Sequence, residues 1–177
     1  MSGNHVFVDE TKRRGYLLVA GVVLPEDLDA VRRVLRGLVL PGQRRLHMKD
    51  ESDSRKRSIA TAISVSDVQA TIHDAGRRYG NERERRAVCL RAIVEDAARR
   101  GDAMLVLEQD DSLVSWDNQH LIEFTRAAGC RDTLGYEHRR AAADLALAIP
   151  DAIAWCWAKG GDWRRRVEPI VTTVREV

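Results

Sequence analysis

The segment from Tyr16 to Val23 is an unbroken apolar run without a charged side chain. A run of this length, rich in leucine and valine, is typical of a strand that is buried on both faces. It follows the β-prone segment His5–Asp9 after a short polar connection that ends at Gly15, which is the pattern of a β-hairpin. The run therefore predicts a strand deep inside a sheet that is covered by other structure.

The rest of the chain alternates between helical and strand-like patterns. The most distinct helix is predicted at Asn81–Arg100, where apolar residues recur on one face and Gly101 is placed as the C-terminal stop. Further helices are predicted at 25–38, 52–63, 117–128 and 150–159, further strands at 43–48, 68–72 and 104–107, and a short segment at 134–138. This alternation favours a layered α/β domain over a helical bundle or a β-sandwich. With 177 residues and no linker or repeat, we expect one domain over residues 1–177.

Composition limits the classes of protein without choosing a partner. The net charge is only +2, so affinity for nucleic acid would require local clustering of basic side chains. Arginines outnumber lysines, which suits phosphate binding but is also what a GC-rich coding sequence yields. Three widely spaced cysteines fit neither a zinc site nor a redox pair, and no stretch is apolar enough to span a membrane. We expect a cytoplasmic protein with no membrane partner.

Acidic residues fall where the predicted strands end. Asp9 and Glu10 end the first strand, Glu108 follows the strand at 104–107, and Asp151 lies in the first turn of the last long helix. If those two strands are neighbours, their carboxyl ends meet at the edge where open α/β sheets tend to bind ligands. Carboxylates gathered there repel one another unless a cation is present, and oxygen ligands suit Mg²⁺ or Mn²⁺. The pattern predicts a divalent-metal site.

Four segments carry a resemblance to a known family: Val6–Glu10, Tyr16–Val23, Arg45–His47 and Leu145–Ala154. Together they resemble the family catalogued as domain of unknown function 3800. The resemblance implies a ribonuclease H-like fold, that is, a single three-layer domain with a mixed sheet flanked by helices. It also implies that the aspartates of the first strand and the last helix, here Asp9 and Asp151, are metal ligands. The sequence departs from the family pattern at Thr11 and Lys12, and at Pro150, which places Asp151 near the amino end of its helix.

Several residues compete for the other positions of the site. Glu108, Asp110 and Asp111 are alternatives for the middle ligand, and Glu108 is favoured because it directly follows the strand. His47 lies in the family-like segment and is a candidate for proton transfer, with His138 as a second candidate. Each of these residues also has an ordinary explanation, as a turn residue, a surface histidine or an acid that stabilises a helix start.

The leading hypothesis is a metal-dependent nuclease that hydrolyses RNA or DNA. Asp9, Glu10, Glu108 and Asp151 would hold Mg²⁺ or Mn²⁺, and Asp9, Glu108, Asp151 and His47 would take part in catalysis. Substrate would be held by arginines such as Arg13, Arg45 and Arg139. The chain contains no GxSxG, GxxxxGK(S/T) or HExxH motif and no GxGxxG motif after a strand, so other catalytic classes lack support. The alternatives are an inactive nucleic-acid-binding or interaction module and a homo-oligomer that associates through its Trp- and Ala-rich last helix.

Overall fold

Six strands form one mixed sheet in the computed structural model, which describes residues 3–101 and 103–177. The strands are β1 (Asn4–Thr11), β2 (Tyr16–Val23), β3 (Gln69–Gly76), β4 (Ala103–Glu108), β5 (Leu134–Arg139) and β6 (Val171–Glu176). Their order across the sheet is β5-β4-β1-β2-β3-β6. The first three strands are antiparallel neighbours, whereas β4 and β5 run parallel to β1, and β6 runs parallel to β3.

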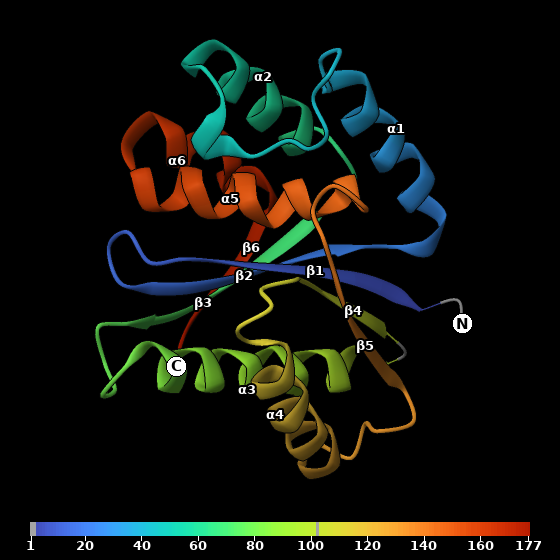
Figure 1. Ribbon diagram of the computed structural model, residues 1–177, viewed down its shortest axis with the longest axis vertical. Coiled ribbons are helices and arrows are strands. Elements are labelled where there is room, and N and C mark those ends of the chain that lie inside the picture. Colours follow the sequence, from blue (N-terminus) through green and yellow to red (C-terminus); the bar gives the residue numbers. More distant parts are fainter. Residues whose placement is uncertain (1–2, 102) are drawn as a thin grey trace.

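Helices cover both faces of this sheet, so the molecule has three layers (Figure 1). The helices are α1 (Leu28–Leu38), α2 (Asp53–Ser64), α3 (Glu82–Arg100), α4 (Val114–Ala127), α5 (Ala148–Lys159) and α6 (Gly161–Val167). Figure 1 places α1, α2, α5 and α6 on one face and α3 and α4 on the other. Every helix in the described part of the chain is too short or too polar to cross a lipid bilayer.

Each face of the sheet has its own hydrophobic core because strand side chains alternate between the two faces. On the α5 face, Phe7 and Val106 pack with Ile149 and Ile153. On the α3 face, the neighbouring strand residues pack against the inner sides of α3 and α4. The strand Tyr16–Val23 contributes to both cores, which confirms that it is buried on both faces.

Helix α5 lies very close to β2 because residue 21 is a glycine. A Cβ atom built on Gly21 would be 2.9 Å from Cγ2 of Ile149 in the first turn of α5. That distance is shorter than a normal van der Waals contact, so any larger side chain would push the helix away from the sheet. Gly21 thereby fixes the height at which the start of α5 sits above the strands.

The predicted α/β layering is confirmed, but the strand predicted at 43–48 is wrong. Residues 43–47 have no regular secondary structure, and a short 3₁₀ turn, Met48–Asp50, follows. This segment crosses the start of α5 instead of joining the sheet. Its residue Leu46 is buried in the core, and its Met48 N–H bonds to a side chain of α5. Strand β6 and helix α6 were not predicted at all.

Candidate metal centre

Asp9 and Glu108 lie side by side at the carboxyl edge of two parallel strands. The last residues of β1 and β4 that pair are Val8 and Leu107, so Asp9 and Glu108 are the next residues on each strand. Both point to the α5 face, because each is two positions beyond a residue of the α5-face core, Phe7 or Val106. The condition on which the sequence argument depended, that these two strands are neighbours, is therefore met.

Asp151 reaches the same region from above, from the first turn of α5. Its Oδ2 atom accepts a hydrogen bond of 2.8 Å from the backbone N–H of Met48. Its Oδ1 atom lies 3.5 Å from Nε2 of His47. Pro150 does not turn the carboxylate away from the sheet, because α5 already begins at Ala148. The structure thus brings His47 and Asp151 together above the strand ends.

The carboxyl groups of Asp9 and Asp151 are hard to ionise. Burial raises the pKa of Asp9 well above its ordinary value of 3.8, and repulsion from Glu108 raises it further. Glu10 and Asp151 add smaller contributions in the same direction. Burial also raises the pKa of Asp151 to about 6, although the Met48 N–H and His47 favour its charged form. The raised pKa values agree with a position of the three acids around the same region of the sheet.

The segment before Met48 forms a polar cover over these acids. Arg45 lies 3.6 Å from Oε1 of Glu108, while His47 contacts Asp151. The side chains of Glu108 and Asp151 remain 25% and 15% exposed, so solvent still reaches both carboxylates.

The chemistry of the donors fits a hard divalent cation, because the converging groups are carboxylate oxygens. As they stand, no three His, Cys, Asp or Glu side chains in residues 3–101 and 103–177 are arranged to hold a metal ion. Each acid is instead engaged elsewhere: Asp9 accepts the Glu10 N–H at 2.8 Å, and the other two contact the polar cover. Binding a cation through all three acids requires rotation of these side chains.

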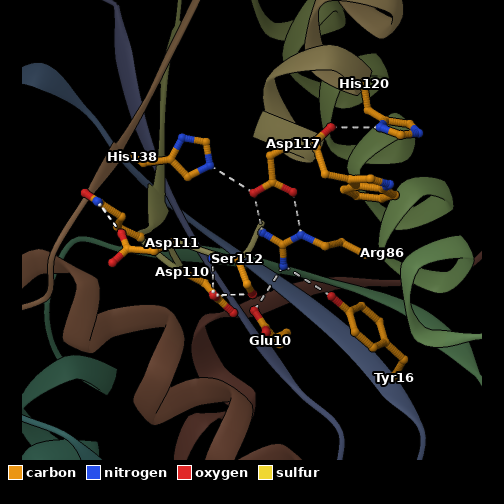
Figure 2. Close-up of polar contacts among 11 residues, drawn as sticks. Glu10, Tyr16, Arg86, Asp110, Asp111, Ser112, Asp117, His120 and His138 are labelled. Carbon is orange, nitrogen blue, oxygen red and sulfur yellow. Dashed lines mark hydrogen bonds and ion pairs between the residues drawn. The ribbon is translucent and has the colours of Figure 1, made fainter. Parts of the chain in front are cut away.

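Glu10 is separated from the other predicted ligands because neighbouring residues of a strand point to opposite faces. It lies on the α3 face, where its Oε2 atom accepts a hydrogen bond of 3.1 Å from Arg86 (Figure 2). The Arg86 side chain is nearly fully buried and also bonds to the Tyr16 hydroxyl at 3.3 Å. Glu10 is thus part of a separate polar network.

Asp117 of α4 is the main partner of Arg86, which is the centre of that network (Figure 2). Its two carboxylate oxygens accept hydrogen bonds of 2.7 and 2.8 Å from Arg86. His138 of β5 adds a third contact, with Nε2 at 2.9 Å from Oδ2 of Asp117. Although burial opposes ionisation, these partners hold the pKa of Asp117 below its ordinary value. His138 is therefore placed on the face opposite Asp9 and Asp151.

The remaining alternatives for the middle ligand also lie away from Asp9. Asp110 accepts hydrogen bonds from Ser112, and Asp111 accepts one from Arg140, in the turn that follows β4. Of the three alternatives, Glu108 is the acid that lies on the strand beside Asp9.

Sequence reasoning missed Arg86 and Asp117, although a signal was present. Arg86 lies four residues before Leu90 on the apolar stripe of its helix, and Asp117 lies four residues before Leu121. A charged side chain at such a position must either distort the core or find a partner there. One helix with a basic residue on its apolar face and another with an acidic residue on its apolar face together indicate a buried ion pair.

No protein-family model matches this chain, and a search of curated proteins finds no relative either. The resemblance to the domain of unknown function 3800 family therefore stays a prediction.

Proposed function

We propose that this protein is a ribonuclease H-like, metal-dependent nuclease that hydrolyses phosphodiester bonds of RNA or DNA. The observation that carries the proposal is that the adjacent strand ends and the first turn of α5 place Asp9, Glu108 and Asp151 on one face of the sheet, where a cation would relieve their mutual repulsion. The mixed sheet with helices on both faces supports the ribonuclease H-like assignment.

The three acids would supply the oxygen ligands. A divalent cation bound there would activate water and neutralise the charge that develops at phosphorus. Arg45, beside Glu108, would face a phosphate of the substrate, and His47, beside Asp151, could hold or move a proton at the leaving oxygen. No side-chain nucleophile is needed for this reaction class.

Cleavage assays with purified protein test the proposal. Labelled single-stranded and structured RNA and DNA should be cut with Mg²⁺ or Mn²⁺, and Asp9→Asn or Asp151→Ala should stop the reaction. Asp132→Asn is the matched control because Asp132 is exposed in a turn away from the site. If all variants cleave equally, a contaminating nuclease is responsible and the proposal fails.

Metal binding gives a second measurement that does not depend on substrate. A cation that binds only the folded state raises its stability by about 2.7 kcal/mol when free ion exceeds Kd roughly 100-fold. Mn²⁺ should therefore raise the melting temperature of the parent, and Asp9→Asn should remove most of that rise while the metal-free variant stays folded.

The rival function is an inactive nucleic-acid-binding module. It is favoured by the finding that, within residues 3–101 and 103–177, no three acidic, histidine or cysteine side chains are arranged to hold a metal ion. Salt-sensitive binding of nucleic acid without cleavage or a Mn²⁺-dependent rise in stability would establish this alternative.

A further inference from the structure

An arginine-rich cavity of about 450 Å³ lies between α1 and the turn that follows β5. Its lining includes Arg32 and Arg36 of α1, Arg139 of β5 and Asp144. The remaining lining residues are uncharged, so the walls carry three positive charges and one negative charge. The excess of positive charge in this one lining is thus as large as the net charge of the whole chain, which is +2.

Asp144 holds two of these arginines in fixed positions. Its side chain is only 5% exposed, and its Oδ2 atom lies 2.7 Å from Nη2 of Arg32 and 2.6 Å from Nη1 of Arg139. Arg139 also contacts Glu137. Although burial opposes ionisation of Asp144, the hydrogen bonds from Arg32 and its other donors hold its pKa below the ordinary value. One charged carboxylate thus orients two guanidinium groups.

The cavity borders the candidate metal centre. Arg139 pairs in register with Glu108 on the neighbouring strand β4, so their side chains point to the same face. Arg45 contacts Glu108 from the polar cover. Basic groups therefore lie next to the acidic strand ends, and a continuous strand of phosphates could extend from the acids toward α1.

We propose that this cavity binds the phosphodiester backbone of a nucleic acid on one side of the scissile bond. The inference rests on the proposed function, since it names where that substrate is held. Guanidinium groups match phosphate oxygens with two parallel hydrogen bonds. Arg32 uses its Nε and Nη2 donors on Asp144, and Arg139 is held by Glu137 and Asp144. These two arginines therefore line the cavity in fixed positions, while the exposed Arg36 would supply the main contact to phosphate. Contacts of this kind fix the position of a strand without reading its sequence.

Arg36→Gln tests the inference, with Arg33→Gln as the matched control. Both arginines are exposed on α1, but Arg33 does not line the cavity, and neither replacement removes a partner of Asp144. Binding of a fluorescein-labelled single-stranded oligonucleotide is followed by fluorescence anisotropy in EDTA, so that cleavage cannot occur. Arg36→Gln should weaken binding about tenfold, as expected for one charged hydrogen bond.

The salt dependence of binding provides a second readout. Loss of one phosphate contact should reduce the slope of log Kd against log salt concentration by about 0.7 for a single strand. Arg33→Gln should leave the affinity within about twofold of the parent. Arg36→Glu should weaken binding more than Arg36→Gln because it adds repulsion. Circular dichroism confirms that each variant is folded.

The outcomes separate the two proposals. Equal affinities of the parent and Arg36→Gln, or equal losses in the Arg36 and Arg33 variants, overturn the cavity as the binding site. Inorganic phosphate is also added at a concentration equal to that of the phosphate groups in the oligonucleotide. If it displaces the oligonucleotide, the inference is overturned, because the cavity would then be a site for small anions. If the Arg36 variants lose binding but the parent never cleaves with metal, the cavity stands as a nucleic-acid-binding site, whereas the nuclease proposal and the position relative to a scissile bond fail.

Discussion

Replacing Asp151 by asparagine should stabilise the metal-free protein at neutral pH. Burial raises the pKa of Asp151 from 3.8 to about 6, so holding this group ionised in the folded state costs about 3 kcal/mol. The side chain is only 15% exposed, so solvent screens little of this cost. Asparagine is an uncharged analogue of the protonated acid, and its side-chain oxygen can still accept the N–H of Met48.

The sign of the effect follows from proton binding. Between pH 4 and pH 6 the folded state binds more protons at Asp151 than the unfolded state does, so this group lowers stability as pH rises. The penalty is absent below about pH 4 and complete above about pH 7. Asp151→Asn should therefore match the parent near pH 4 and be up to about 3 kcal/mol more stable at pH 8. For a chain of this size that corresponds to a rise of about 6 to 12 °C in melting temperature.

Thermal unfolding in EDTA at pH 4, 6 and 8 measures this difference directly. Asp132→Asn is the control, because this exposed turn residue should give the same small change at every pH. Addition of Mn²⁺ at pH 8, at about 100-fold above Kd, should remove most of the difference, since the parent gains about 2.7 kcal/mol from the bound cation and Asp151→Asn loses a charged ligand. A variant that is no more stable than the parent at pH 8 would contradict the argument from burial and repulsion.

Two further predictions concern the packing that supports the site. Gly21→Ala should lower the free energy of unfolding, measured with urea, by about 1 to 3 kcal/mol, because the added methyl group would overlap Ile149. Gly37→Ala, on the open surface of α1, should instead raise the free energy of unfolding by up to about 1 kcal/mol. Equal effects at the two glycines would count against the close approach of α5 to β2. Arg86→Met should cost about 3 to 5 kcal/mol because it leaves the buried Asp117 without its main partner, and the double variant with Asp117→Leu should recover part of that loss. An unchanged urea midpoint in Arg86→Met would show that the ion pair adds little.

The sequence predicted the elements whose signals are local. Helix α3 begins after Asn81, whose side chain caps the Glu84 N–H, and ends at Gly101, whose φ of +98° suits glycine. Segment 43–48 was predicted as a strand and is not one, because its path is set by distant partners such as Asp151. The mostly exposed edge strand β6 has no apolar run that would mark it.

The site was partly predictable for the same reason. Strand ends located Asp9 and Glu108, but which strands are neighbours is decided by the whole sheet. Strand alternation could have separated Glu10 from Asp9 in advance. By contrast, the contact between Met48 and Asp151 and the pairing of Arg45 with Glu108 depend on where an irregular segment crosses α5, and no local pattern encodes that crossing.

The position of β1 in the sheet has a consequence for protein synthesis. Its hairpin partner β2 follows within a few residues, but the parallel strand on its other side, β4, begins only at Ala103. While the ribosome makes the intervening chain, the N–H and C=O groups on that edge of β1 have no strand to pair with, and a free edge of this kind can pair with other chains. A nascent chain stalled before residue 103 should therefore require protection of this edge by chaperones, and the release of β4 should remove that requirement at β1.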